Sequence, residues 1–578
     1  MLSNSTSRTA FRIAFLAIFS IALLMGSLPV TSTTLAGLAP FAGWKPDFVA
    51  PSVLITAPAS GTTVAGTIAV DVSASDDRRV NLVKLYVDGH LFAQDALPPF
   101  TFLWSTALEA NASHTLTAMA VDAAGNATAS QPLDVAVRNP PVTARPDIVL
   151  VLTDDQRWDT MQYMPLTNSL LYADSVRFTN AIAAVPLCCP SRASLLTGLY
   201  AHNHGVIDNI PPYGGAPMFD DTSTIATWLH EAGYRTGLFG KYLNYFYEIA
   251  SERPVPPGWD QFYAFLNNNG NYYNYRLAEN GLTVAYGNRP EDYATAVITE
   301  KAVEFITTAD PDEPLFVYLA PFAPHSTSAA VDSPPTPGPG DAGAYAHLSP
   351  WRPATYNEAD VSDKPLWVRD LPLLTPAQME KGDQFRIKQL ESLLAVDRAV
   401  ASLVDALVKT GRYENTIFVF LSDNGLSWGE HRWNLKKWCA YEECIRIPFW
   451  IRVPGVPGRA EDALVDNVDL APTLAQFAGA QPASPVNGVS RVDLIRDPQA
   501  PRLGEAYTEF ISPALAGAKT IFRALRTSSY FYAQYENGDR EFYDLALDPL
   551  EEHNRVSDPA YWQTVDDLRR VLEVLKNQ

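Results

Sequence analysis

The sequence predicts an α/β protein built on one large, mostly parallel sheet and preceded by a small all-β sandwich. The early part of the chain has short alternating runs rich in Val, Thr, Ala and Ser, which are typical of strands with one buried face. The later part has uninterrupted apolar runs separated by helical stretches, which are typical of strands buried on both faces. The chain has 578 residues, more than one core usually serves, so two or more domains are expected.

The N-terminus has the layout of a secretory signal. Arg8 and Arg12 precede an apolar run at residues 13–28, and small and polar residues follow as far as Ala36. We expect residues 1–36 to be a cleaved signal peptide, so that the mature protein is secreted, periplasmic or held at the cell surface. A membrane anchor is the alternative, but the run is short of the roughly 20 residues of a spanning helix. No later segment is long and apolar enough for stable membrane insertion.

Residues 48–139 are predicted to form the β-sandwich. Alternating runs at residues 67–72 and 83–89 indicate strands, and turn residues separate them. The run at residues 118–126 resembles the late strand and turn of the immunoglobulin-like modules that are attached to many secreted bacterial enzymes. Such a module is either a spacer or a binding module for a polysaccharide or a cell surface.

A Pro-rich linker at residues 140–146 leads into the large α/β domain, which is predicted to occupy residues 140–578. Its buried strands are expected at residues 148–152, 315–319 and 417–421. Its helices are expected at residues 222–232, 293–308 and 387–409. Ligands of such sheets gather beyond the carboxyl ends of the strands, so the site is expected there.

Charge and cysteine content restrict the function. The 43 Lys and Arg residues against 64 Asp and Glu residues give a net charge of -21, which repels nucleic acid and anionic lipid surfaces. No nucleic-acid partner is expected, and an anionic substrate needs local cations or a metal ion. Four cysteines are too few for a disulfide scaffold and lack zinc-type spacing. Cys439 and Cys444 are either a disulfide or two partly buried thiols.

Two predicted strands end in pairs of oxygen ligands. The run at residues 148–153 leads into Asp154 and Asp155, and the run at residues 417–422 leads into Asp423 and Asn424. Each pair alone is more often a turn or a helix cap. Both pairs at strand ends of one sheet would meet in one site, and three carboxylates with an amide oxygen suit Ca²⁺ better than Mg²⁺.

The segment at residues 188–198, with the sequence Cys-Cys-Pro-Ser-Arg-Ala-Ser-Leu-Leu-Thr-Gly, reads as the start of a helix. Pro190 lies in its first turn, and Cys188 lies where the helix dipole favours anions. Arg192 lies one turn further on and can point back at Cys188. The alternative is a capped helix that carries a cysteine by chance.

The spacing Cys-x-Pro-Ser-Arg followed by Leu-Thr-Gly resembles the signature of the type I sulfatases. The resemblance implies the alkaline-phosphatase and sulfatase type of fold, with a smaller C-terminal subdomain from about residue 490. It also implies that a formylglycine-generating enzyme converts Cys188 to formylglycine, whose hydrate is the nucleophile, while Cys189 is a bystander. The implied metal is one Ca²⁺. Its implied ligands are Asp154, Asp155, Cys188, Asp423 and Asn424.

A second element, at residues 233–244, resembles the second signature of the same family. It implies that Lys241 binds a sulfate oxygen. Many members have histidine where this chain has Leu243, and that histidine assists the release of sulfate. The role is therefore open to His204, Asn244 or a water molecule.

Later segments resemble further family elements. Ala323-Pro324-His325 implies that His325 donates a proton to the leaving alcohol, a role that the pKa of histidine permits. The runs at residues 429–431 and 437–443 imply a second sulfate-binding lysine, Lys437, with Lys436 as its solvated neighbour and His431 as a weaker candidate contact. The run at residues 543–554 resembles the C-terminal subdomain. The resemblance covers residues 145–555 in the family's order.

The sequence thus predicts a hydrolase of sulfate esters. The residues at 188–189, 201–204 and 240–244 resemble the N-acetylglucosamine-6-sulfatase branch more than the arylsulfatases, which implies a sulfated sugar or glycan as substrate. One alternative is a phosphonate or phosphate monoester hydrolase of the same superfamily. Another is a catalytically inactive, secreted glycan-binding protein.

Overall fold

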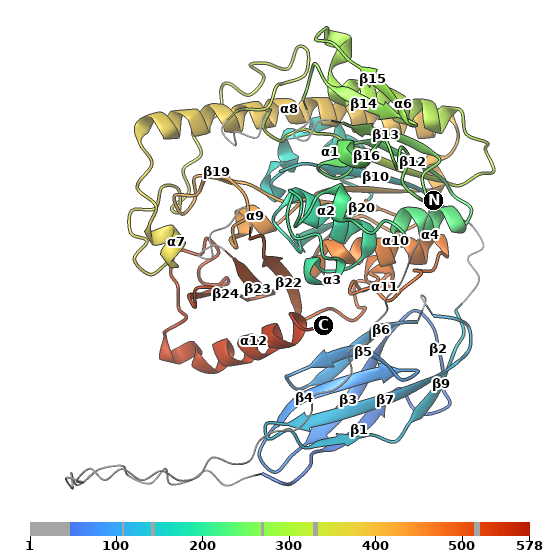
Figure 1. Cartoon of the computed structure of the whole chain (residues 1–578), viewed down its shortest axis with the longest axis vertical. Coiled ribbons are helices and arrows are strands. Elements are labelled where there is room, and N and C mark those ends of the chain that lie inside the picture. The colour runs from blue at the N-terminus through green and yellow to red at the C-terminus, as the bar shows by residue number, and fades with distance from the viewer. Residues whose placement is uncertain (1–46, 107–108, 140–144, 267–270, 328–332, 514–520) are drawn as a thin grey trace, which may run out of the picture. The chain divides into compact units, whose positions relative to one another are not determined.

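The structure is a computed structural model that describes residues 47–106, 109–139, 145–266, 271–327, 333–513 and 521–578 (Figure 1). The predicted signal peptide at residues 1–36 lies outside the described residues. Within the described ranges, no helix combines the length and the apolar character that crossing a membrane requires.

The first described part is a sandwich of two mostly antiparallel sheets. One sheet has the order β1 (Ser52–Ala57), β3 (Thr67–Ser75), β6 (Phe100–Ser105). The second has the order β2 (Thr63–Val64), β9 (Leu133–Val137), β7 (Ser113–Asp122), β4 (Val80–Val87), β5 (His90–Asp95), and β8 (Ala127–Ala129) pairs with β7. In β4 and β7 alternate side chains are buried, as one-sided strands require. The core of the sandwich is built around the fully buried Trp104.

The large sheet has ten strands, and its central strands are parallel. From one edge to the other they are β15 (Leu282–Ala285), β14 (Arg276–Glu279), β13 (Gln261–Phe265), β12 (Arg235–Gly240), β16 (Leu315–Ala320), β10 (Asp147–Thr153), β17 (Thr416–Ser422), β20 (Phe449–Arg452), β11 (Ser175–Ile182) and β21 (Arg459–Asp466). The three apolar runs of the sequence are therefore neighbours, β16, β10 and β17. Every residue of these three strands is buried.

Helices cover both faces of this sheet (Figure 1). Side chains of β10 alternate between two apolar clusters: Ile148, Leu150 and Leu152 belong to one, and Val149 and Val151 to the other. The first cluster includes α2 (Cys188–Thr197), α4 (Ile225–Glu231) and α10 (Leu470–Ala478). The second includes α6 (Ala294–Thr307) and α8 (Pro376–Lys409). Burial on both faces explains why the strands read as continuous apolar runs.

The C-terminal part is a four-stranded antiparallel sheet in the order β22 (Glu505–Phe510), β23 (Phe522–Thr527), β24 (Tyr530–Tyr535), β25 (Arg540–Asp544). Helix α12 (Trp562–Leu575) follows it. The predicted helices correspond to α4, α6 and α8, but α8 begins eleven residues earlier than expected, at Pro376 rather than Ile387. Its first turns are polar, and Thr375 and Gln378 form a capping box that starts the helix.

Candidate active site

The predicted site residues lie at the carboxyl ends of four neighbouring parallel strands, β12, β16, β10 and β17. Thr153 of β10 pairs with Ser422 of β17, so Asp154 and Asp423 leave the sheet at the same level. Strand β12, which pairs with β16, ends one residue before Lys241. The topology therefore brings together side chains that are far apart in the sequence.

Cys188 is the first residue of α2 and has only 1% of its surface exposed. Its Sγ lies 3.3 Å from Oδ1 of Asp154 and 4.0 Å from Oδ1 of Asp155. Burial, followed by the charge of Asp154, raises the pKa of the Cys188 thiol to about 12. An unmodified Cys188 is thus a neutral thiol at pH 7, and a neutral thiol is a poor nucleophile.

Two buried lysines reach this cluster from different segments. Lys241 forms an ion pair with Asp154. Lys437 follows β19 (Asn434–Lys436), and its Nζ lies 2.6 Å from Oδ1 of Asp155 and also contacts Sγ of Cys188. Burial alone would lower the pKa of Lys437, but the carboxylate of Asp155 raises it well above the ordinary value. The ammonium group therefore stays charged, and it offsets part of the negative charge of the carboxylates in the cluster.

Arg192 supplies the third cation, in a direction different from the predicted one. Its Nε donates to Oδ2 of Asp423 over 2.8 Å, and its Nη1 donates to the carbonyl oxygen of Lys241 over 2.9 Å. Its Nη2 lies 3.9 Å from Oδ2 of Asp154. The prediction that Arg192 points back at Cys188 is replaced by these contacts, because two carboxylates at the strand ends attract the guanidinium group.

The carboxylates of the cluster differ in their ionisation. Burial opposes the ionisation of Asp154, but Lys241, His325 and Arg192 together lower its pKa well below the ordinary value. Burial and the charge of Asp154 raise the pKa of Asp423 to about 6. Nearby cations thus dominate at Asp154, whereas burial and the neighbouring negative charge dominate at Asp423.

His325 follows β16 and faces the same cluster. Its Nδ1 lies 2.8 Å from the carbonyl oxygen of Ser326, to which it donates, and its Nε2 lies 3.5 Å from Oδ2 of Asp155. Burial lowers the pKa of His325 below its ordinary value. The tautomer with Nδ1–H leaves Nε2 as the nitrogen that faces the carboxylates.

The position of the missing histidine is part of the core. Leu243 is buried in the apolar cluster that includes α2 and α4. His204 uses both of its ring nitrogens locally, since Nδ1 accepts from the backbone N–H of Val206 at 3.1 Å and Nε2 lies 2.9 Å from Oγ of Ser194. Of the three candidates for the open role, Asn244 and water remain.

The surroundings of Lys436 and His431 differ from those predicted. Lys436 is half-buried, with its Nζ 4.5 Å from the ring centroid of Trp433, rather than fully solvated. His431 is wholly buried, pairs with Glu358 through Nδ1 at 2.8 Å and stacks on Tyr441 at a centroid distance of 4.0 Å. These contacts direct His431 toward Glu358 and Tyr441 rather than toward Asp154.

The four cysteines fall into two classes. Cys439 and Cys444 form a disulfide, with their Cα atoms 5.6 Å apart. Cys188 and Cys189 are buried and unpaired. The side chain of Cys189 belongs to the apolar core around α2, which is compatible with a bystander position.

Two polar residues that position the helix were missed by the sequence analysis. Oγ of Ser191 donates to the carbonyl oxygen of Asp423 at 2.5 Å, and Nδ2 of Asn467 donates to Oγ of Ser191 at 2.8 Å. Oδ1 of Asn467 also accepts from the backbone N–H of Ala184 at 3.0 Å. These bonds fix the start of α2 against β17. Ser191 lies within the first signature, but nothing in the sequence near Asn467 indicates this contact.

The side chains at the strand ends fit a hard cation. Three carboxylates, from Asp154, Asp155 and Asp423, converge with the amide of Asn424. Oδ1 of Asn424 is buried and has no hydrogen-bond partner among the described residues. One oxygen each of Asp154 and Asp155, Sγ of Cys188 and a ring nitrogen of His325 all lie within 4.8 Å of one another. Nδ2 of Asn424 donates to Oδ1 of Asp155 over 2.7 Å, and Ca²⁺ would bind the amide through Oδ1 in place of this contact.

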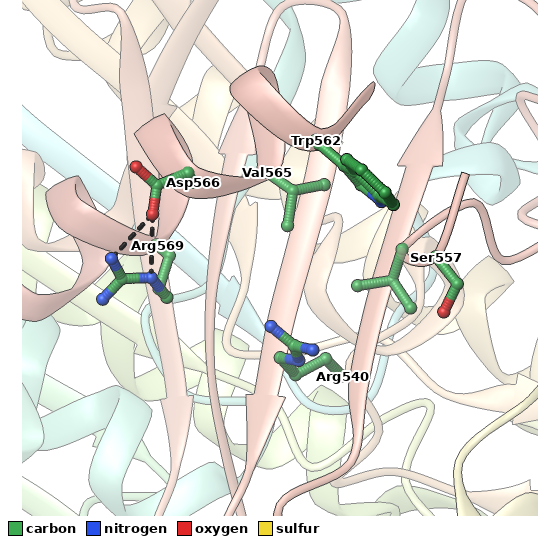
Figure 2. Close-up of a pocket in the computed structure, with 7 residues that line it drawn as sticks. Arg540, Ser557, Trp562, Val565, Asp566 and Arg569 are labelled. Carbon is green, nitrogen blue, oxygen red and sulfur yellow. Dashed lines mark hydrogen bonds and ion pairs between the residues drawn. The ribbon is translucent and has the colours of Figure 1, made fainter. Parts of the chain in front are cut away.

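A separate pocket of about 320 Å³ lies between α12 and the C-terminal sheet (Figure 2). Trp562 at its rim is 62% exposed, and Arg569 pairs with Asp566. The residues that line it are Arg540, Val556, Ser557, Trp562, Val565, Asp566 and Arg569. None of them is among the predicted catalytic or metal residues, so we assign the chemistry to the cluster at Asp154.

Three protein-family models match parts of this chain. The family model described as Sulfatase matches residues 146–480. The model described as N-sulphoglucosamine sulphohydrolase, C-terminal, matches residues 429–578, and that of a bacterial Ig domain matches residues 51–118. The predicted family resemblance and the immunoglobulin-like module are thereby confirmed.

The individual proteins that are similar to this chain include sulfatases. The chain is 32% identical over 366 residues to the extracellular sulfatase SULF-1 homolog of Drosophila melanogaster, which covers 61% of this chain and 31% of that protein. It is 33% identical over 366 residues to N-acetylglucosamine-6-sulfatase of Homo sapiens, with 61% and 65% covered. The chain therefore spans less than two thirds of the length of these curated relatives.

Solved structures confirm the predicted α/β fold. One, in complex with its substrate D-glucosamine-2-N,6-O-disulfate, has a TM-score of 0.64 at 25% identity and covers 75% of this chain and 98% of that chain. The phosphonate monoester hydrolase of Agrobacterium radiobacter has a TM-score of 0.59 at 21% identity, with 75% and 96% covered. The second likeness is one of fold alone.

Proposed function

The chain belongs to the sulfatase family, and we propose that it hydrolyses sulfate esters with a modified Cys188 as its nucleophile. One observation carries the proposal: Cys188 begins α2 between Asp154 and Lys437, in a buried cluster that also holds Lys241 and Arg192. Buried cations around a nucleophile position suit a reaction in which negative charge develops on a sulfuryl group.

The nucleophile needs chemistry that a thiol does not supply. Because Cys188 is the first cysteine of the sulfatase signature, we propose that a formylglycine-generating enzyme converts this residue to formylglycine during maturation. When hydrated, formylglycine supplies one oxygen for attack on sulfur and a second hydroxyl whose deprotonation releases sulfate. Cys189, with its side chain in the core, is not used.

The cations bind and orient the sulfate ester. Lys241, Lys437 and Arg192 offset negative charge on the sulfuryl oxygens, and their own ion pairs hold them in place before substrate arrives. His325 donates a proton to the departing alcohol oxygen through Nε2. Because Nδ1 donates its proton to the carbonyl oxygen of Ser326, Nε2 must bind a second proton before it can act as the acid.

The metal set is proposed to be Asp154, Asp155, Asp423 and Asn424 together with position 188. These residues would hold one Ca²⁺, which supplies positive charge for polarising the sulfate. The orphan Oδ1 of Asn424 and the three convergent carboxylates support this assignment.

The substrate is proposed to be a sulfated sugar or glycan, in particular N-acetylglucosamine 6-sulfate. Support comes from the human relative named N-acetylglucosamine-6-sulfatase and from the solved structure whose substrate is a sulfated glucosamine. The motifs at residues 188–189, 201–204 and 240–244 point to the same branch.

The signal peptide and the domain bounds are proposed from the sequence pattern. We propose that residues 1–36 are a cleaved signal, that residues 48–139 are an accessory module, and that residues 140–578 are the catalytic domain, with its C-terminal subdomain from about residue 490. A relative named as an extracellular sulfatase supports a location outside the cytoplasm.

Mass spectrometry of the peptide that contains position 188, from natively exported protein, tests the nucleophile. Hydrolysis of an aryl sulfate, of N-acetylglucosamine 6-sulfate and of an aryl phosphonate is measured in parallel for the wild type, Cys188→Ala and the matched control Cys189→Ala. We expect formylglycine at position 188, a preference for sulfate esters, loss of activity in Cys188→Ala and retained activity in Cys189→Ala.

A higher kcat/KM for the phosphonate would instead assign the chain to the phosphonate hydrolases of the same fold. An unmodified thiol at position 188 in folded protein, with no ester hydrolysed, would overturn the enzymatic proposal in favour of a glycan-binding protein.

A further inference from the structure

A second buried group of metal-type ligands lies outside the cluster at Asp154. A ring nitrogen of His431 and one carboxylate oxygen each of Glu443 and Glu551 all lie within 4.8 Å of one another. His431 follows β18 (Ser427–Trp428), Glu443 belongs to α9 (Glu442–Ile445), and Glu551 follows β25. Three separate segments thus converge on one point.

All three side chains are buried and incompletely bonded. His431 is 0%, Glu443 7% and Glu551 1% exposed. Nε2 of His431, Oε2 of Glu443 and Oε1 of Glu551 each lack a hydrogen-bond partner among the described residues. Buried polar atoms are almost always paired, so three orphans in one place need an explanation.

The hydrogen bonds around the group orient it. Nδ1 of His431 donates to Oε2 of Glu358 over 2.8 Å, which leaves Nε2 as a lone-pair acceptor. Oε2 of Glu551 accepts from the backbone N–H of Glu442 over 3.0 Å, which leaves Oε1. A carboxylate that holds the far nitrogen of a histidine is the usual outer partner of a metal-binding imidazole.

With His431 neutral and both carboxyl groups ionised, the remaining atoms that face each other are acceptors only. Two buried carboxylates this close together are costly unless a cation joins them.

We propose that His431, Glu443 and Glu551 bind a divalent transition-metal ion that has a structural role. One imidazole and two carboxylates form a mixed nitrogen and oxygen set, which suits Zn²⁺ or Mn²⁺ better than Ca²⁺, whose ligands are oxygens. The site is distinct from the proposed calcium site, with which it shares no residue.

The ion would tie the C-terminal part to the loop that carries Lys437. His431 and Glu443 stand on either side of Lys437 in the sequence, and the Cys439–Cys444 disulfide closes the same loop. Glu551 lies in the segment after β25, where its carbonyl oxygen accepts from Nζ of Lys364 over 2.7 Å. Binding would therefore stabilise the segment that supplies a proposed sulfate-binding lysine.

The test uses the full-length chain with Ca²⁺ at saturation, so that the first site is filled. Zn²⁺ and, separately, Mn²⁺ are titrated into metal-depleted wild type by calorimetry, and elemental analysis counts the metal ions retained per chain. We expect one transition-metal ion beyond calcium and a rise in the thermal midpoint that grows with metal concentration.

Glu443→Gln and Glu551→Gln preserve side-chain size, and each is expected to weaken binding by at least about 100-fold, since even the loss of an outer partner costs 10- to 100-fold. Glu391→Gln is the matched control, because Glu391 is fully buried on α8 and outside the group. Wild type that binds neither metal above calcium would overturn the proposal. Unchanged affinity in both Gln variants would overturn it equally, because the ion would then lie elsewhere.

Discussion

Nε of Arg192 lies 2.8 Å from Oδ2 of Asp423, and neither side chain has any exposed surface. Removal of the guanidinium group in Arg192→Ala leaves a buried carboxylate without its cation. We expect the free energy of unfolding to fall by about 3–5 kcal/mol, measured by urea denaturation of the metal-depleted protein. Arg352→Ala is the control, because Arg352 and Asp383 form a partly exposed pair that is worth at most about 1 kcal/mol. Equal losses in the two variants would contradict this account.

Gly240 is required by a close backbone contact immediately before Lys241. Its φ is +119°, and a Cβ there would lie 2.1 Å from the carbonyl oxygen of Ala320. Gly240→Ala is expected to cost about 2 kcal/mol or more of stability and to lower kcat/KM by at least about tenfold, because Lys241 is displaced. Gly205→Ala, at φ +76° with no heavy atom near its Cβ, is expected to cost about 1 kcal/mol and to retain activity.

Leu243 is a core residue, although many family members have histidine at that position. We expect Leu243→His to lower stability by about 2–3 kcal/mol without raising kcat, because the imidazole replaces a packed apolar side chain. Thermal unfolding and steady-state kinetics measure the two effects. Leu243→Met, of similar volume, is the control and should cost less than about 1.5 kcal/mol. A gain of kcat in Leu243→His would mean that the position does reach the reacting group.

Because of the buried His204, we expect the folded protein to lose stability in mild acid. Burial lowers its pKa from 6.5 to about 4, and the N–H of Val206 occupies the nitrogen that would have to accept the proton. The unfolded chain binds this proton between pH 6.5 and 4 and the folded chain does not, so stability falls as the pH falls through that window.

We expect about 1–2 kcal/mol of the wild-type loss between pH 7 and pH 5 to come from His204, as measured by urea denaturation at each pH. His204→Asn keeps an acceptor but does not titrate, so its unfolding free energy should fall by correspondingly less. An identical pH profile in the two proteins would show that His204 is not the responsible group.

Metal removal tests the proposed calcium ligands. Chelation should abolish sulfatase activity, and added Ca²⁺ should restore it. Asn424→Leu keeps the branched shape but removes the amide oxygen together with the N–H donors to Asp155 and Gly425, so the Ca²⁺ concentration for half-maximal activity should rise by at least about tenfold. Activity of Asn424→Leu that is unchanged at limiting Ca²⁺ would exclude this oxygen from the ligand set.

The sequence was a good guide wherever local pattern decides structure. The run that became β10 has every side chain buried, so it has no polar interruption, and Asp154 and Asp155 at its end were recognisable for that reason. The start of α8 was missed, because its first turns are polar and are set by a cap rather than by an apolar face.

Contacts that depend on sheet order could not be foreseen. Arg192 pairs with a carboxylate 231 positions away, and Asn467 reaches Ser191 across 276 positions. Nothing local to Arg192 distinguishes Asp423 from Cys188 as its target. The orphan atoms of His431, Glu443 and Glu551 are likewise invisible until three segments are folded together.

The order of strands in the large sheet also determines when its strands can pair during synthesis. β10 is made first, yet both of its neighbours, β16 and β17, are made later, and Asp155 meets Asp423 across a separation of 268 residues. At roughly 5–20 residues per second, a ribosome needs on the order of 10–50 s to complete that stretch. During that time β10 has neither of its neighbouring strands, so both of its edges and the carboxylates at its end are unpaired. A nascent chain is therefore exposed to aggregation after β10 emerges, and Asp155 can meet Asp423 only after more than two thirds of the protein has been synthesised.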